Sequence, residues 1–496
     1  MSEIEALLKQ DGPTRAAALA EKLASKTGIK AEAARQRLAR ARPPIRKYPL
    51  FLLPKREGFF YLEEQRNTER YWSNLLRDLR ATGSIYGLAI DAFMARGGIV
   101  PQDEFAVISG APVALKRQIP SEGVAKMLVD LGVITVHDSA DLGPCYVANE
   151  YAVAHPEPSS VIRTRSLVEG VILDGLREWV RKNGFASYDK IAIRGEDHPR
   201  MVGQFKWDLT GPSYLMPLRG PKSQNGFFVA DVFSDIRMDA QAARYFIRKA
   251  ILYRQTSRSG DILPLLMAES FTGEALTLCH KAGIIPCTPS NLFGNKVGAA
   301  IMALTATLKH AAGIAINNPE KLYNLLDSLS EIEGAAGNMR GILFELIVVH
   351  LAKKTFGGGL EMGISAKHAK TGESADIDVQ CVTENRIRLI ECKGRAPGGT
   401  VTRSDVEHWL KKLPVFQNHL SRMPHLSERH QEYMIWTTGT FEPDAITFLE
   451  AERLKRTKRP ISWKDGSDVR QLARDAKLKV LGKAMDEHFL RHPLSA

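Results

Sequence analysis

The feature that most constrains this chain is a charged segment that still has the composition of two β-strands. It spans residues 375–395 and has the sequence ADIDVQCVTENRIRLIECKGR. Both arms are rich in β-branched and apolar residues, and the polar residues between them predict a turn. With Glu384 and Asn385 as the central turn residues, the segment is predicted to be an antiparallel hairpin in which Asp378 lies opposite Glu391.

Side chains alternate along a strand, so the same register predicts Asp376 opposite Lys393, on the face that carries the acid pair. Two carboxylates that face each other repel and destabilise a bare sheet. A divalent cation removes that repulsion, and Mg²⁺ takes oxygen ligands from one or two carboxylates. A neighbouring lysine can steady an anionic substrate or a developing hydroxide. The pattern predicts a metal site for phosphodiester chemistry, and a solvated edge hairpin of mixed charge is the alternative.

Asp378 followed by Glu391-Cys392-Lys393 resembles the core motif of the PD-(D/E)xK, or restriction-endonuclease-like, nuclease superfamily. Members of that superfamily tend to carry a further acid on a helix before the hairpin. Here the segment GNMRGILFELIVVHLAKKTF, residues 337–356, has helical periodicity and holds Glu345 inside its apolar stretch.

The segments after the hairpin fit the same resemblance. A Gly/Pro loop is followed by a predicted helix capped near Ser404, with Glu407 three residues on, and residues 432–441 then predict a strand. Helix, hairpin, helix and strand is the order of the α/β core in that superfamily. The resemblance covers about a third of the chain, and members of the superfamily differ widely in function.

The resemblance also implies roles for the motif residues. Asp378 and Glu391 are expected to bind Mg²⁺, for which Mn²⁺ would substitute, with the carbonyl of Cys392 as a third ligand. Glu345 is expected to hold a metal-bound water or a second ion. Lys393 is expected to orient the attacking water or to help deprotonate it.

The composition of the whole chain indicates its domain number, its type of partner and its cellular location. A chain of 496 residues predicts several domains, and a net charge of +12 favours an anionic partner, most simply DNA. No apolar run is long enough to span a membrane, and the first residues are unlike a signal peptide. The five cysteines are scattered without zinc-ligand spacing. We therefore expect a soluble, cytoplasmic protein with free thiols.

Positive charge is concentrated at the N-terminus, where residues 1–57 hold 13 Lys and Arg against 6 Asp and Glu. Two predicted helices, 17–25 and 31–41, are followed by two predicted short strands in 48–62, an order that resembles a winged helix-turn-helix. Such a domain would contact DNA through its second helix and its wing, here with Arg35, Arg37, Arg40, Lys55 and Arg56. A protein-interaction module is the alternative.

These patterns predict a multidomain chain, with N-terminal winged-helix-like α+β structure followed by α/β restriction-endonuclease-like domains. We place a winged helix at 1–70, a second winged-helix-like domain at 71–155, a helical linker at 301–335 and the intact nuclease domain at 336–490. The segment between the winged helices and the linker, 160–300, repeats the strand and helix order of the nuclease domain. It is interpreted as a degenerate copy with Phe233 in the position of Lys393, and a generic α/β domain is the alternative.

The function predicted on this basis is a metal-dependent DNA endonuclease, acting either in antiviral defence against foreign DNA or in DNA repair. Two alternatives stay open: a non-catalytic DNA-binding or regulatory protein with nuclease-like domains, and a nuclease that cleaves RNA. Cutting both strands of a duplex suits a homodimer or a complex with partner proteins, and no membrane contact is expected.

Overall fold

The structure is a computed structural model that describes residues 2–139, 142–196, 198–220, 224–257, 259–309 and 336–490. The chain forms two compact units. Unit 1 comprises Met1–Asp138, Pro144–Pro158 and Pro199–Pro286. Unit 2 comprises Ser139–Gly143, Ser159–His198 and Cys287–Ala496. The predicted linker lies outside the described residues from position 310 onward, and the predicted domain boundaries stay predictions.

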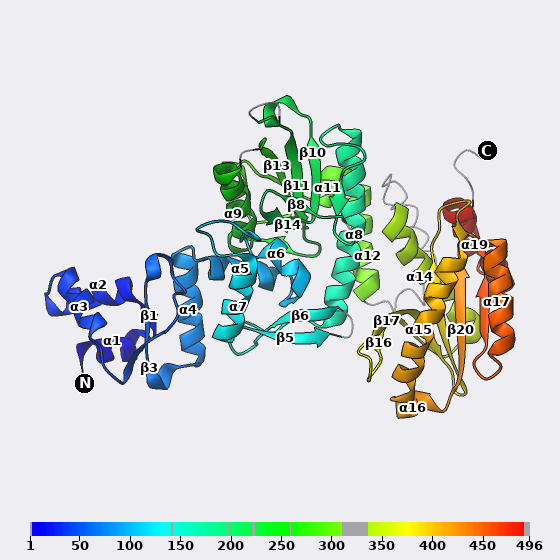
Figure 1. The fold of residues 1–496 in the computed structure, drawn as a ribbon, viewed down its shortest axis with the longest axis horizontal. Coiled ribbons are helices and arrows are strands. Elements are labelled where there is room, and N and C mark those ends of the chain that lie inside the picture. Colours follow the sequence, from blue (N-terminus) through cyan, green and yellow to red (C-terminus); the bar gives the residue numbers. More distant parts are fainter. Residues whose placement is uncertain are drawn as a thin grey trace. The chain divides into compact units, whose positions relative to one another are not determined.

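Unit 1 begins with three helices and a small antiparallel sheet of order β1-β3-β2 (Figure 1). Its elements are α1 (Glu3–Asp11), β1 (Thr14–Arg15), α2 (Ala16–Thr27), α3 (Ala31–Ala39), β2 (Ile45–Lys47) and β3 (Phe59–Leu62). This order agrees with the predicted helices, but the first arm of the hairpin is β2 and not residues within 48–53. Leu52 and Leu53 instead pack into the apolar core of the following segment. The winged-helix assignment remains a prediction.

The next segment of unit 1 is mainly helical and shares an apolar core with later residues of the same unit. Buried Trp72, Leu79, Phe93 and Leu128 are among its members. The elements are α4 (Glu69–Ala81), α5 (Ile85–Ala95), β4 (Ile99–Pro101), α6 (Phe105–Ile108), α7 (Ser121–Leu131), β5 (Ile134–Ser139) and β6 (Gly143–Ala148). Helix α7 is followed by the paired strands β5 and β6, and the sheet has the order β4-β6-β5.

The last part of unit 1 is an α/β module whose sheet runs β15-β13-β11-β10. Strands β10 and β11 are antiparallel, whereas β11 and β13 are parallel and are joined by the crossover helix α9. The elements are β10 (Leu209–Ser213), β11 (Gly226–Val232), α9 (Ala240–Thr256), β13 (Ile262–Met267), α10 (Gly273–Lys281) and β15 (Ile285–Cys287).

Unit 2 contains a five-stranded mixed sheet of order β16-β17-β18-β20-β22. Strands β16, β17 and β18 pair antiparallel, and β18, β20 and β22 pair parallel. The strands are β16 (Gly359–Lys367), β17 (Ser374–Val382), β18 (Arg386–Lys393), β20 (His430–Thr437) and β22 (Ile461–Lys464). The predicted hairpin thus lies in the middle of a sheet, and the solvated-edge alternative is wrong because β16 and β20 flank it.

Helices α14 and α15 both contact this sheet, and α15 and α17 provide the crossovers between its parallel strands (Figure 1). The principal helices of unit 2 are α8 (Ser159–Lys182), α12 (Asn295–Lys309), α14 (Ala336–Phe356), α15 (Arg403–Ser421), α17 (Pro443–Lys455), α18 (Gly466–Asp475) and α19 (Lys479–Met485). Trp409, Leu413 and Phe416 of α15 share a core with Leu389 and Tyr433 of the sheet.

The start of α15 differs from the expectation of a cap near Ser404. Its N-cap is Thr402, whose hydroxyl accepts from the backbone of Asp405, and the Asp405 carboxylate accepts from the Thr402 backbone in return. Glu407 instead pairs with Arg403 on the helix surface at 2.9 Å. Both Thr402 and Ser404 are good caps, and the short strand β19 (Thr400–Val401) brings Thr402 to the helix end.

None of the described helices is long and apolar enough to cross a membrane. The five cysteines are all buried and unbridged, which agrees with the expected free thiols.

Gly394, directly after β18, is the point where the hairpin meets α14. A Cβ on Gly394 would lie 2.5 Å from the carbonyl oxygen of Arg340, whereas a Cβ on the adjacent helical Gly341 would meet nothing within 4 Å. We expect Gly394→Ala to destabilise unit 2 by about 1–3 kcal/mol because backbone must move.

Gly341→Ala is the matched control. It should be neutral or stabilising by up to about 1 kcal/mol, since alanine favours a helix interior over glycine. Chemical denaturation of both variants measures the difference, and equal stability of the two would contradict the close approach.

Candidate active site

The charged hairpin forms in the predicted register. The pairs run from Val382 with Ile387 to Val379 with Ile390, and the next positions along the strands are Asp378 and Glu391. The turn is closed by the N–H of Thr383, which donates to the carbonyl of Arg386 at 2.9 Å. The Asp378 carboxylate accepts a 2.6 Å hydrogen bond from the backbone N–H of Cys392. The acid pair is therefore held at one end of the hairpin.

Glu391 is the carboxylate on which the positive charges of the site converge. Its side chain is 3% exposed, and its Oε1 lies 2.9 Å from Nζ of Lys393. Lys412, on α15, donates to both carboxylate oxygens of Glu391 at 2.8 and 3.1 Å. Two lysines from different elements thus converge on one buried carboxylate.

Lys412 did not emerge from the sequence analysis, although its spacing contains a signal. It follows Trp409 by three residues and precedes Phe416 by four, so it falls within the buried stripe of α15. Ile387, Leu389 and Glu391 alternate onto one face of β18, and both apolar members of this series belong to the core that includes α15. A lysine in that stripe accordingly meets Glu391.

Glu345 joins the acid pair from α14. Burial raises the pKa of Glu345 well above its usual range, and the charges of Asp378 and Glu391 raise it further. The charge of Arg163 acts in the opposite direction. The structure therefore brings together the three acids that the sequence analysis named, and their roles in binding a metal stay predictions.

Arg163, on α8, is a second residue that the sequence analysis missed. It donates to the carbonyl of Gly363 and pairs with Asp376 at 3.7 Å. Asp376 also pairs with Ser365 of β16 along the sheet. The ion-pair partner of Lys393 is Glu391 and not Asp376. The pairs between β17 and β18 end at Val379 and Ile390, so the register position of Asp376 opposite Lys393 stays a prediction.

The charged form of Asp378 is disfavoured at this site. Burial raises the pKa of Asp378 to about 7, and the charge of Glu391 contributes to the rise. The N–H of Cys392 and the charges of Lys412 and Lys393 oppose it. The two lysines therefore do not offset the burial of Asp378 and the charge of Glu391, and a cation next to Asp378 would favour its charged form.

The donor set fits a cation that takes few protein ligands. Among the described residues, no three His, Cys, Asp or Glu side chains form a ready cage for a metal ion. Mg²⁺ does not require such a cage, because it is usually held by one or two carboxylates and keeps several waters. Asp378 and Glu391 match that requirement. Cys392 has a buried thiol whose pKa is raised well above its usual range by burial, so any contribution to metal binding would come from its carbonyl.

The residues predicted to contact DNA lie in unit 1. Arg35 and Arg37 are exposed on α3, and Arg40 ends that helix. Lys55 and Arg56 are exposed in the turn between β2 and β3. Arg37 is paired with Glu3 at 3.5 Å, a contact between exposed groups that costs little to exchange for phosphate.

Comparisons with known proteins add little. No family model matches the chain, and no curated protein matches it. Among solved structures, a repair endonuclease from Pyrococcus abyssi is similar at 14% identity over 29% of this chain, with a TM-score of 0.17. The match spans about half of that protein, 53% of its chain. Similarity at this level carries no argument about fold or function, so the function must be argued from the site.

The pKa of Asp378 predicts a pH dependence of stability. The usual pKa of aspartate is 3.8, so the folded chain holds the proton of Asp378 more tightly than the unfolded chain does. Deprotonation between about pH 4 and 8 therefore destabilises the folded state. In EDTA, the Tm of wild type should fall relative to that of Asp378→Asn as pH rises through this window, and Mg²⁺ should reduce the loss.

Asp405→Asn is the control for this measurement. Although burial opposes it, hydrogen bonds from Thr402 and the charge of Arg395 lower the pKa of Asp405. The charge of Asp405 contributes its full stabilisation at pH values above the pKa that Asp405 has in the unfolded chain. The difference in Tm between Asp405→Asn and wild type should therefore be constant above about pH 5. If the difference in Tm between Asp378→Asn and wild type is equally constant, the raised pKa of Asp378 is contradicted.

Proposed function

We propose that this chain is a metal-dependent endonuclease that hydrolyses phosphodiester bonds in DNA at the Asp378–Glu391 pair. The observation that carries the proposal is the opposed, buried acid pair with two lysines on one acid. Glu391 and Lys393 stand at the carboxyl end of β18, which is parallel to β20. Ligand sites of open α/β sheets lie outside the carboxyl ends of parallel strands, so this position suits a substrate.

Asp378 and Glu391 would hold Mg²⁺, or Mn²⁺ in its place, together with the carbonyl of Cys392. When bound, such an ion polarises the scissile phosphate and lowers the pKa of a coordinated water. Glu345 would accept a hydrogen bond from water at the site. Burial raises the pKa of Glu345 and the charge of Asp378 raises it further, so a cation bound near these acids would favour the charged form of Glu345.

Lys393 would orient the attacking water and offset charge on the phosphate. Burial lowers the pKa of Lys393, but the charge and hydrogen bond of Glu391 outweigh burial and raise it above 10.5. A lysine that stays protonated supports an orienting and electrostatic role over proton abstraction. Lys412 would act through Glu391. It donates to both carboxylate oxygens and would therefore orient the carboxylate toward the metal ion.

The partner that fits the rest of the chain is duplex DNA. Net charge of +12, with the excess concentrated in residues 1–57, supports binding to a polyanion. The exposed arginines of α3 and the basic turn at Lys55 would contact phosphates, which positions the duplex without specifying its sequence.

Plasmid cleavage with Mg²⁺ or Mn²⁺ tests the catalytic assignment. We expect Glu391→Gln and Lys393→Met to lower the cleavage rate by about 10²–10⁴-fold, because the first removes a proposed metal ligand and the second removes a positive charge beside the reacting phosphate. Lys412→Met should lower it by about 10–100-fold and raise the metal concentration needed for half-maximal rate.

Lys411→Met is the matched control, since Lys411 is exposed on the same helix next to Lys412. It should leave the rate within about twofold of wild type. Cleavage that persists in folded Glu391→Gln and Lys393→Met would eliminate this site. Wild type that binds DNA and cuts with neither metal would favour the non-catalytic DNA-binding alternative, and cleavage of RNA alone would favour the ribonuclease.

DNA binding is tested in the non-cleaving Glu391→Gln background. Arg35→Ala, Arg40→Ala and Arg56→Ala should each weaken binding to all DNA sequences similarly. Each should also reduce the slope of log K against log salt by about 1 in magnitude, since one phosphate contact is lost. Fluorescence anisotropy measures both quantities.

Lys26→Ala serves as the control, because Lys26 is exposed on α2, outside the predicted contact helix and turn. An unchanged salt slope in all three arginine variants would show that DNA is bound elsewhere on the chain.

A further inference from the structure

Unit 1 contains a second hairpin with opposed acids. The pairs between β10 and β11 run from Ser213 with Gly226 to Leu209 with Ala230, and the next positions are Asp208 and Asp231. The backbone N–H of Val232 donates to Asp208 at 3.0 Å. In unit 2 the residue after the second acid, Cys392, makes the same bond to the first acid.

The helix after each hairpin carries a lysine onto the second acid. Lys249 of α9 lies 2.8 Å from Asp231, and Lys412 of α15 lies 2.8 Å from Glu391. Both helices are crossovers that lead from the second hairpin strand to the next parallel strand. Register, backbone bond and lysine thus match between the two hairpins.

The two acid pairs differ in what surrounds them. Asp208, Asp231 and Lys249 are each 0% exposed, whereas the side chains of Lys393 and Lys412 are 26% and 20% exposed. Lys393 has no equivalent in unit 1, since Phe233 occupies its place.

Arg96, which ends α5, covers the Phe233 ring at 4.0 Å and pairs with Asp208 at 2.8 Å. Each acid of the buried pair therefore forms an ion pair with a basic side chain: Asp208 with Arg96, and Asp231 with Lys249.

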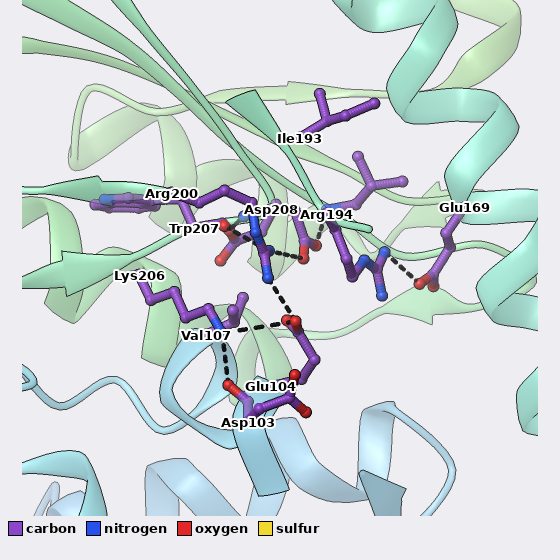
Figure 2. Close-up of polar contacts among 12 residues, drawn as sticks. Asp103, Glu104, Val107, Glu169, Ile193, Arg194, Arg200, Lys206, Trp207 and Asp208 are labelled. Carbon is purple, nitrogen blue, oxygen red and sulfur yellow. Dashed lines mark hydrogen bonds and ion pairs between the residues drawn. The ribbon is translucent and has the colours of Figure 1, made fainter. Parts of the chain in front are cut away.

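These contacts come from a segment that precedes the α/β module by about a hundred residues. Nζ of Lys249 also donates to the carbonyl of Val107 in α6 at 2.9 Å. Buried Arg200 lies 3.8 Å from Asp208 and pairs with Glu104, and Lys206 donates to the carbonyl of Asp103 at 2.6 Å (Figure 2). Residues 96–107 are thus bound to the module at its acid pair and around it.

We propose that the Asp208–Asp231 pair is a sealed joint and not a second metal or catalytic site. Arg96 and Lys249 take the place that a divalent cation would have, and their contacts fasten α5 and α6 to the α/β module of unit 1. The sealed joint, defined by Arg96, Asp208, Asp231 and Lys249, does not depend on cleavage by unit 2.

Lys249→Met tests the joint, with Lys22→Met as matched control. Lys22 pairs with Asp11 at the same 2.8 Å distance but is exposed. Removing one partner of a buried pair leaves an uncompensated charge, so Tm should fall by roughly 6–20 °C for Lys249→Met and by at most about 4 °C for Lys22→Met. Equal losses in the two variants would overturn the proposal.

The double variant Asp231→Asn/Lys249→Met covers the case in which Lys249→Met does not fold. It removes both charges. The amide oxygen of the asparagine introduced at position 231 can still accept from the backbone N–H of Asp208, and its N–H can donate to the hydroxyl of Tyr245, which donates to Asp231 in the wild type. We expect it to recover at least half of the loss in Tm or to restore soluble protein. A double variant no more stable than the single one would overturn the charge pairing.

Hydrogen exchange tests whether the two segments open together. In Lys249→Met, or in the double variant if the single one does not fold, protection should fall in both 85–108 and 209–232 and should be unchanged in 374–393. Loss of protection in 209–232 alone would show that the acid pair does not fasten the helices.

Mn²⁺ binding, measured by electron paramagnetic resonance, tests the absence of a metal site in unit 1. Asp378→Asn/Glu391→Gln should retain no saturable site. A remaining site that disappears on Asp208→Asn/Asp231→Asn would overturn the proposal. Wild type that binds no Mn²⁺ at all would contradict the proposed function of unit 2 and would agree with the sealed joint.

Discussion

The opposition of Asp378 and Glu391 across neighbouring strands is the constraint on which unit 2 depends. Two carboxylates at opposed positions on neighbouring strands repel, and they cannot move apart unless the two strands lose their pairing. Neighbouring elements therefore supply compensation: β18 contributes Lys393, α15 contributes Lys412, and the N–H of Cys392 binds Asp378. The compensation is incomplete, as the pKa of Asp378 near 7 shows. Under the proposed function, a bound cation would favour the charged form of Asp378 and would attract the phosphate.

The chain handles an opposed acid pair in two ways. In unit 1 a basic side chain stands on each acid and the pair is completely buried, so the acids serve packing. In unit 2 both lysines stand on Glu391 and keep part of their surface exposed, while Glu345 adds a third acid. The same hairpin geometry thus yields a joint or a candidate active site, according to the number and exposure of the charges around it.

Much of the hairpin could be predicted because its determinants are local. A two-residue turn and alternation of side chains place Asp378 opposite Glu391 without knowledge of any other segment. Glu345 could be named because an acid inside an apolar helical stretch needs a partner. Lys412 and Arg163 were missed, since a charged residue on a long helix is ordinarily solvated. The first arm of the N-terminal hairpin was misplaced because Leu52 and Leu53 have strand-like composition and pack as core.

By itself, the sequence determined the elements that depend on short-range periodicity: the register of the charged hairpin, the helices around it and the cluster of positive charge near the N-terminus. Only the tertiary structure decided which cations neutralise which acids. Lys412 reaches Glu391 across the packing of α15 on the sheet, and Arg96 reaches Asp208 across more than a hundred residues of chain. Coulomb interactions act through space and depend on burial, so they are set by the fold and not by proximity along the chain.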